Sequence, residues 1–240
     1  MKIQASAILA SVLAAPAIAN PGVVFTDATG DIASGISTGN GTLDLVSMEV
    51  SHTATDIQFK LTVNGNLGNT DWGKFMIGIS SSGTKTSSGN GWGRPINMSS
   101  NGGMTHWIGS WADGGGGSQL WTNGGSGWSG PGATAGYVIA GGANSTITYT
   151  VSRASIGMVG NGTLYFDAYS SGGGGGDGAI DALSRSNASV SNWGDSFTTS
   201  GVASGTSAST TGGAFAYVIP APGALALLGV AGLLGAKRRR

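Results

Sequence analysis

Hydrophobic and polar residues alternate along several short stretches of the chain. Between residues 57 and 63, Ile, Phe, Leu and Val occupy every second position, with Gln, Lys and Thr between them. The same period of two returns at residues 46–50, 75–79, 147–151 and 164–168. Since successive side chains of a strand point to opposite faces, this pattern predicts strands with one buried and one solvated face. Sheets with that property are typically antiparallel.

The stretches between these predicted strands are rich in glycine, which accounts for 46 of the 240 residues. Asn64-Gly65 and Gly160-Asn161-Gly162 are residues that tight turns favour. We therefore expect an all-β fold, an antiparallel β-sandwich or jelly roll of about eight to ten strands. Residues 80–103 and 112–135 lack the alternation. They are predicted to be long loops, which compact domains usually keep for binding or leave mobile.

The first 19 residues have the three parts of a secretory signal peptide. Lys2 supplies the positive start, residues 5–15 are apolar, and Ala17-Ile18-Ala19 forms an A-x-A cleavage site. A buried N-terminal helix is the alternative, but Pro16 just before the cleavage site favours the signal peptide. The sequence therefore predicts an exported protein whose N-terminal signal helix is removed by a signal peptidase.

The last 22 residues combine a proline motif, an apolar run and a basic end, in that order. The apolar run covers residues 224–236, preceded by Pro220, Ala221 and Pro222 and followed by Lys237, Arg238, Arg239 and Arg240. This run predicts a short C-terminal transmembrane helix, below the roughly 20 residues that span a bilayer comfortably. The basic cluster would hold the C-terminus on the cytoplasmic side.

This tail resembles the PEP-CTERM sorting signal, which exosortases recognise in Gram-negative bacteria that make exopolysaccharide. One position departs from the family pattern, because Ala221 stands where the family has Glu between the prolines. The resemblance implies a precursor held in the membrane, then cleaved near the proline motif by an exosortase and released or attached outside the cell. A simple tail anchor is the alternative.

Charge is distributed unevenly along the chain. The formal net charge is zero, but all eleven acidic residues lie between Asp27 and Asp195, whereas five of the eleven basic residues lie in the two terminal segments. The middle therefore carries six basic and eleven acidic residues, a net charge of −5. Because nucleic-acid binding needs a basic surface, we expect no nucleic-acid partner. The absence of cysteine excludes disulfides, so the core or bound ions must hold the fold.

The central region resembles the DOMON-like and family 9 carbohydrate-binding-module-like β-sandwiches in the order of its features. An Asp-x-x-Gly-Asp segment opens it at residues 27–31, a Trp precedes a strand at 71–75, and a Phe-Asp strand at 166–169 is followed by an acidic loop at 176–181. The predicted organisation is then a signal peptide (1–19), a β-sandwich domain (20–198), a Ser/Thr/Gly-rich segment that could contain a last strand (199–218) and the sorting signal (219–240).

Four aspartates stand in segments suited to a metal ion. Ca²⁺ takes 6 to 8 oxygen ligands from carboxylates, carbonyls and water, usually on loops. The N-terminal Asp-rich segment and the later Gly-Asp-Gly loop offer that chemistry through Asp27, Asp31, Asp177 and Asp181. If the two segments meet, a Ca²⁺ ion would fasten the N-terminus to the sandwich. The alternative is that these aspartates cap turns and strands.

Five of the seven tryptophans lie in or beside the two predicted loops: Trp92, Trp107, Trp111, Trp121 and Trp128. Exposed indoles stack on sugar rings, whereas buried indoles fill a core, and the sequence leaves both readings open. Arg94 is the cation near this cluster. It could donate paired hydrogen bonds to a sugar or a carboxylate, although a surface ion pair is its commoner use.

Together these features predict a non-enzymatic protein of the cell surface or extracellular matrix that binds glycan. A structural or adhesive protein without a specific ligand is the main alternative. An extracellular hydrolase is less favoured, because glycoside hydrolysis needs two positioned carboxylates and the acidic residues fall mostly in turn contexts. Expected partners are signal peptidase, exosortase, polysaccharide and, before tail cleavage, the membrane.

Overall fold

The computed structural model describes residues 20–134 and 136–220, and the regular structure of these residues consists almost entirely of β-strands. In chain order, the strands of these residues are β1 (Val23–Thr26), β2 (Leu45–His52), β3 (Asp56–Val63), β4 (Lys74–Ser80), β5 (Ile96–Met98), β6 (His106–Trp111), β7 (Gly117–Asn123), β8 (Trp128–Gly132), β9 (Gly136–Ala140), β10 (Thr146–Ser152), β11 (Gly162–Ser171), β12 (Asp181–Ala182), β13 (Phe197–Thr199) and β14 (Phe215–Ile219). Two single 3-10 turns, Ser100–Gly102 and Asp113–Gly115, interrupt the loops.

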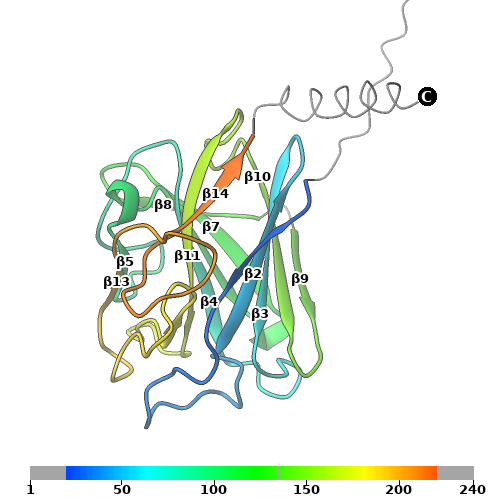
Figure 1. Ribbon diagram of the computed structural model, residues 1–240, viewed down its shortest axis with the longest axis vertical. Coiled ribbons are helices and arrows are strands. Elements are labelled where there is room, and N and C mark those ends of the chain that lie inside the picture. Colours follow the sequence, from blue (N-terminus) through cyan, green and yellow to red (C-terminus); the bar gives the residue numbers. More distant parts are fainter. Residues whose placement is uncertain (1–19, 135, 221–240) are drawn as a thin grey trace, which may run out of the picture.

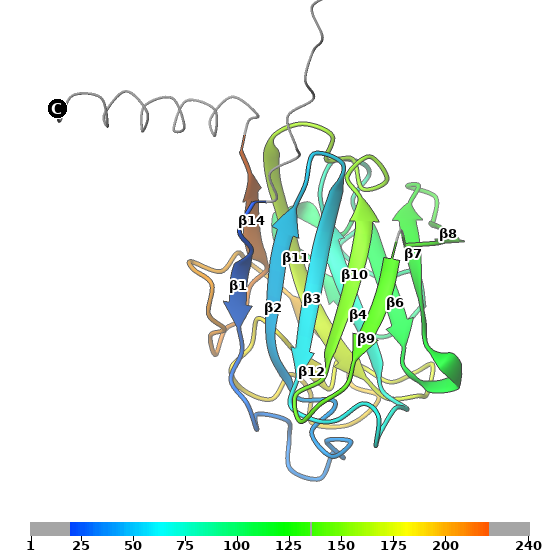
Figure 2. The same cartoon turned by 90° about the vertical axis from the view of Figure 1, so that its right-hand side faces the viewer.

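Two antiparallel sheets face each other, as in a β-sandwich (Figure 1). The first sheet has five strands in the order β1-β2-β3-β10-β9, seen face-on in Figure 2. The second has seven strands, in the order β12-β11-β4-β6-β7-β8, with β14 also paired to β11. A small parallel pair, β13 and β5, lies beside them. The all-β, antiparallel fold predicted from the alternation is therefore present.

The main hydrophobic core lies between the two sheets. In β3 the second, fourth, sixth and eighth residues are all buried, as the alternation predicts. At the centre, the ring of Phe166 lies 5.0 Å from Phe25, 5.8 Å from Phe59 and 6.0 Å from Phe215. These four rings come from both sheets and are fully buried or nearly so. Their burial joins the two sheets through apolar contacts at the centre of the sandwich.

The outer face of the seven-stranded sheet is also covered, which the alternation does not predict. Six successive residues of β4 and the last six of β11 are buried. The outward side chains of Met76, Trp107 and Tyr169 form a second hydrophobic cluster with residues such as Ile96 and Ile180, which come from the long connections. These connections fold back across the sheet, so both faces are shielded from water at β4 and along most of β11.

Three strands lie inside the two stretches predicted to be loops, namely β5, β7 and β8. The prediction of continuous loops is wrong there because β7 and β8 are rich in glycine and polar residues and lack the period of two, while β5 has only three residues. Glycine supplies the room that bulky neighbours need. An added Cβ at Gly117 of β7 would lie 2.4 Å from the indole of Trp111.

The sandwich continues past the predicted domain boundary at residue 198. Strand β14 pairs with β11 over five residues, and Phe215 and Tyr217 of β14 are buried. The chain enters β1 and leaves β14 at the same end of the sandwich (Figures 1 and 2). Among the described residues, no helix is long and apolar enough to cross a membrane. The predicted signal peptide and nearly all of the predicted sorting signal lie outside the described residues.

Candidate functional site

Carboxylates from three separate segments meet at one end of the sandwich. Asp27 follows β1, Asp31 lies four residues later, and Asp181 begins β12 of the opposite sheet. One carboxylate oxygen from each lies within 4.8 Å of the other two. Asp44, directly before β2, adjoins this group, because its Oδ2 accepts a hydrogen bond of 2.9 Å from the backbone N–H of Gly30. We call Asp27, Asp31, Asp44 and Asp181 the acidic centre.

Half of the oxygens of the acidic centre lack a hydrogen-bond donor. Asp181 is satisfied, since its two oxygens accept from the backbone N–H groups of Leu45 (2.7 Å) and Ala182 (2.8 Å). By contrast, Oδ2 of Asp27, both oxygens of Asp31 and Oδ1 of Asp44 are buried from water without a partner. Buried polar atoms in proteins are normally hydrogen-bonded, so four such oxygens on three neighbouring aspartates require an explanation.

The carboxyl groups of the acidic centre resist ionisation. Burial raises the pKa of Asp31 to about 6, and the charge of Asp44 adds to the rise. The pKa of Asp27 lies far above its usual range because of burial and the charges of Asp181 and Asp31. Burial also raises the pKa of Asp181, with further contributions from Asp31 and Asp44. Near neutral pH the acidic centre therefore needs either bound protons or a bound cation.

The structure brings together three of the four aspartates predicted to bind a metal and places the fourth elsewhere. Asp177 instead closes a tight glycine-rich loop, in which its Oδ2 accepts from the backbone N–H of Gly174 at 2.8 Å. Asp44 was missed by the sequence reasoning. The sequence feature that could have identified Asp44 is its place between two leucines, directly before a strand. When such apolar neighbours are buried, the carboxylate between them lies in the protein interior as well.

The predicted ligand-binding tryptophans divide into one buried residue and four half-buried ones. Trp107 has no exposed surface and stacks on Tyr169 with ring centroids 6.0 Å apart, so it belongs to the second hydrophobic cluster. Trp92 and Trp121 both donate their indole N–H to Oε1 of Gln119, at 2.9 and 3.3 Å. The ring of Trp111 lies 6.4 Å from that of Trp92.

We call Trp92, Trp111 and Trp121 the tryptophan face. Trp111 and Trp121 point outward from β6 and β7, and Trp92 comes from the loop above them. Trp92 packs against the backbone of Gly109, where an added Cβ would lie 2.3 Å from the indole. The three partly exposed indoles are thus held in defined orientations on one side of the sheet.

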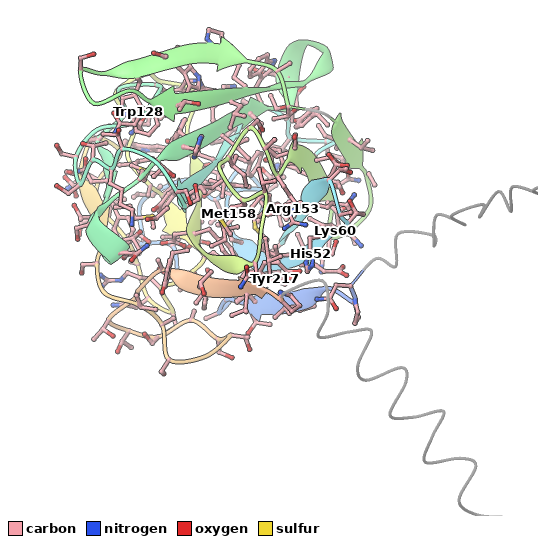
Figure 3. The ribbon with its side chains drawn as sticks, turned by 90° about the horizontal axis from the view of Figure 1, so that it is seen from above. His52, Lys60, Trp128, Arg153, Met158 and Tyr217 are labelled. Carbon is pink, nitrogen blue, oxygen red and sulfur yellow. The ribbon has the colours of Figure 1, made fainter. Side chains whose placement is uncertain are left out.

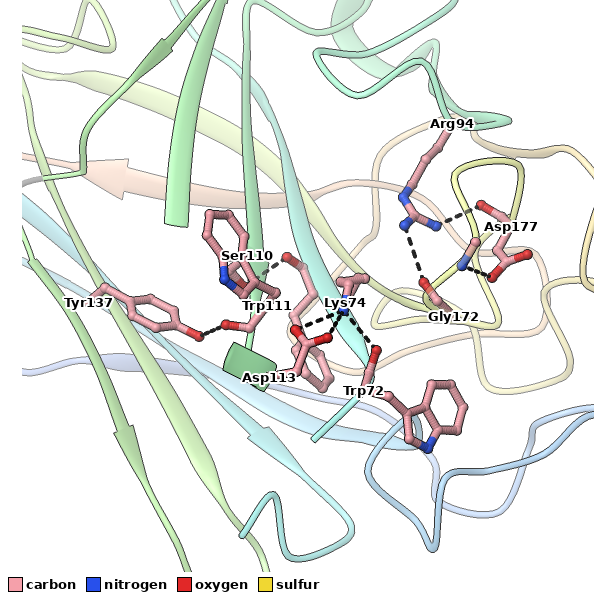
Figure 4. A network of polar contacts seen from close by, with 11 residues as sticks. Trp72, Lys74, Arg94, Ser110, Trp111, Asp113, Tyr137, Gly172 and Asp177 are labelled. Carbon is pink, nitrogen blue, oxygen red and sulfur yellow. Dashed lines mark hydrogen bonds and ion pairs between the residues drawn. The ribbon is translucent and has the colours of Figure 1, made fainter. Parts of the chain in front are cut away.

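Arg94 is a structural residue beneath this face, not an exposed cation. It is only 6 % exposed. Its guanidinium donates to Oγ of Ser171 (2.8 Å) and to the carbonyls of Gly172 and Asp177 (both 3.2 Å), as Figure 4 shows in part. The guanidinium carbon also lies 5.5 Å from the centre of the Trp92 ring. Arg94 therefore joins the loop of Trp92 to the glycine-rich loop and supports the indole from below.

Trp128 lines an open cleft of about 360 Å³ between the loop of residues 84–90 and the β7–β8 turn. The other lining groups are mostly polar and uncharged, including Asn90, Asn123 and Ser126, with Lys85 the one charged side chain in the cleft wall. Figure 3 shows Trp128 beside the edge strand, away from His52 and Tyr217. An aromatic ring beside amides and hydroxyls suits a polyhydroxylated ligand.

The two histidines of the chain are both buried. His52 is 8 % exposed, and its Nδ1 lies 2.7 Å from the hydroxyl of Tyr217. His106 is 4 % exposed, and burial lowers its pKa to about 4. Each is held neutral within the fold, which favours a packing role for both.

The comparisons with known proteins add no family. No family model matches the chain, and no curated protein or solved structure matches it. The candidate sites therefore rest on their own geometry.

Proposed function

We propose that this chain is an exported protein of the cell surface or extracellular matrix that binds polysaccharide and is not an enzyme. The observation that carries the proposal is the tryptophan face. Its indoles are half-buried, and two of them share Gln119 as hydrogen-bond acceptor. A fixed, partly exposed indole offers a flat apolar surface to a sugar ring at little entropic cost.

The cleft of Trp128 extends this surface with uncharged hydrogen-bonding groups. Its amide and hydroxyl side chains match the donors and acceptors of sugar hydroxyls. The acidic centre does not support the hydrolase alternative, because both carboxylate oxygens of Asp31 and one of Asp27 are inaccessible to water. A glycosidase needs its two carboxyl groups beside the scissile bond.

Export and sorting belong to the same proposal. The predicted signal peptide at residues 1–19 would deliver the chain across the membrane, and the apolar run at 224–236 would hold it there until an exosortase cleaves near Pro220 and Pro222. In support, the folded region begins and ends at the same end of the sandwich (Figure 2). Such a domain can stand on a membrane anchor with its opposite end free. The proposal also includes a jelly-roll order of the strand connections and a helix in each of the two terminal segments.

Affinity electrophoresis with soluble polysaccharides, both neutral (xylan, dextran) and acidic (alginate, hyaluronate), tests the binding function. We expect retention by at least one of them. Trp121→Ala and Trp128→Ala should each weaken that retention about tenfold, the loss of about 1.4 kcal/mol. Trp193→Ala is the matched control, since this half-buried indole packs on Trp72 (6.1 Å) outside the tryptophan face. Absence of retention by every polysaccharide would instead support the structural or adhesive alternative.

Cell fractionation of the native host tests the sorting function. The wild-type chain should pass from the membrane fraction to the cell surface or the medium with loss of its tail. Joint replacement of Pro220 and Pro222 by Ala should leave the uncleaved chain in the membrane. If the wild-type chain itself stays uncleaved in the membrane, the tail is a simple anchor and the sorting proposal fails.

A further inference from the structure

The acidic centre joins the ends of both sheets without any covalent link. Asp27 and Asp31 belong to the segment after β1, and Asp44 precedes β2 of the same sheet. Asp181 starts β12 of the other sheet, and its Oδ2 accepts from the backbone N–H of Leu45, the first residue of β2, at 2.7 Å. Three separate chain segments therefore meet here, and the carboxyl groups that they bring together repel one another when ionised.

No side-chain cation within the described residues compensates these charges. The two ion pairs found there, Lys60 with Glu49 and Lys74 with Asp113, involve other acids. Asp44 is only 4 % exposed, yet its Oδ1 has no donor. Together with Oδ2 of Asp27 and both oxygens of Asp31, it leaves four buried acceptor atoms that no protein group satisfies. Burial of unpaired carboxylates is costly, so the site calls for a positive ligand.

We propose that the acidic centre binds one Ca²⁺ ion through Asp27, Asp31, Asp44 and Asp181. The four donor-free oxygens would be ligands, and Asp181 would add one more through a free lone pair. Backbone carbonyls or water would complete the 6 to 8 oxygens that Ca²⁺ prefers.

The donor set favours Ca²⁺ over other common divalent ions. All candidate ligands are hard oxygens, and neither histidine nor cysteine is among them, which disfavours Zn²⁺. Mg²⁺ binds few carboxylates and retains several waters, whereas here the free oxygens are already buried. Asp27, Asp31 and Asp44 also come from a connection that contains four glycines, which accommodates the irregular coordination of Ca²⁺.

The ion would act as a staple between the two sheets. It would hold the segment after β1 against β2 and β12, at the end of the sandwich opposite to the chain's entrance and exit (Figures 1 and 2). A chain without cysteine would gain in this way a cross-link of the kind that disulfides give to many exported domains. This inference does not depend on polysaccharide binding, and its test uses no glycan.

Isothermal titration calorimetry of the signal-free protein, treated with chelator and then dialysed, tests the site. We expect one Ca²⁺ per chain, with weaker binding of Mg²⁺. In thermal melts, Ca²⁺ at about 100 times its dissociation constant should raise the Tm by about 5–10 °C relative to chelator.

Two variants distinguish a loss of Ca²⁺ binding from a general loss of stability. Asp31→Asn and Asp44→Asn should each weaken Ca²⁺ binding at least about tenfold, since affinity follows the charge of the ligand set. In chelator, however, Asp31→Asn should melt at or above the wild type, because it removes one repelling charge and Asp31 accepts no hydrogen bond. Asp177→Asn is the control and should keep the wild-type response to Ca²⁺.

Three results would overturn the proposal. The first is no binding heat up to millimolar Ca²⁺ together with equal melting temperatures in Ca²⁺ and chelator, which would mean that protons neutralise the acidic centre. The second is wild-type affinity in both Asp31→Asn and Asp44→Asn. The third is tighter binding of Mg²⁺ or Zn²⁺ than of Ca²⁺.

Discussion

Buried Gly109 lies under Trp92, and its replacement by alanine perturbs the tryptophan face from its buried side. Gly109 is on β6 with its α-carbon facing the indole. An added Cβ would lie 2.3 Å from Cε2, 2.4 Å from Cζ2 and 2.8 Å from Cδ2 of Trp92, whereas ordinary contact begins at 3.4 Å. The rigid indole must therefore move outward by about 1 Å, the difference between those distances.

The cost of this movement follows from what holds Trp92 in place. Its indole N–H donates to Gln119 at 2.9 Å, and its ring lies above the buried guanidinium of Arg94. Insertion of a methyl group into a packed site costs about 1–3 kcal/mol. A weakened hydrogen bond to Gln119 adds about 0.5–1.5 kcal/mol. Together these two contributions lead us to expect that Gly109→Ala lowers the free energy of unfolding by about 1.5–4.5 kcal/mol.

Urea denaturation followed by circular dichroism measures this change, with the midpoint falling and the slope unchanged. Gly136→Ala in β9 is the matched control, because its Cβ would meet Thr150 at 3.4 Å, an ordinary contact. It should change stability by no more than about 0.5–1 kcal/mol.

A double-mutant cycle identifies Trp92 as the cause. In a Trp92→Ala background the clash is gone, so Gly109→Ala should cost less than about 0.5 kcal/mol. Two outcomes refute the reasoning: a wild-type midpoint for Gly109→Ala, or an equal cost of Gly109→Ala with and without the indole.

Three further predictions concern pH, the core and a buried cation. In chelator, the stability of the wild type relative to Asp31→Asn should fall as pH rises from about 4 to 6. The pKa of Asp31 is about 6 in the folded chain against the ordinary 3.8 of an aspartate, so the folded state binds more protons in that window. A difference in melting temperature between the two proteins that does not change with pH contradicts this. Phe166→Ala should lower the free energy of unfolding, measured by urea denaturation, by about 3–5 kcal/mol, because the fully buried Phe166 ring packs against three other phenylalanine rings. Phe166→Leu should lower it clearly less, and an equal loss in both variants would contradict the packing explanation. Arg153→Met should lower the free energy of unfolding by at least about 3 kcal/mol, since the guanidinium donates to five backbone carbonyls, among them those of Thr53 and Gly160. The control is Arg185→Met, because the only side-chain hydrogen bond of Arg185 in the described part of the chain goes to Asn187. This control should change stability by less than about 1 kcal/mol.

The sequence by itself determined which central stretches are strands with one buried face. The alternation at residues 57–63 and 147–151 predicted β3 and β10 because the period of two is a property of the extended backbone and needs no partner. It also placed Asp27 and Asp31 in one short segment, where spacing alone allows the two side chains to share a ligand. These features are local, and local backbone geometry follows directly from the order of the residues.

Only the tertiary structure decided which distant groups meet. Asp181 and Asp177 stand four residues apart, yet only Asp181 reaches the acidic centre, because β12 pairs with β11 there while Asp177 closes the preceding loop. Trp107 and Trp111 lie on the same face of β6, but the long connections bury the first completely and the second only in part. Burial and site membership depend on how glycine-rich connections fold across a finished sheet, and such connections carry no periodic pattern from which their course can be derived.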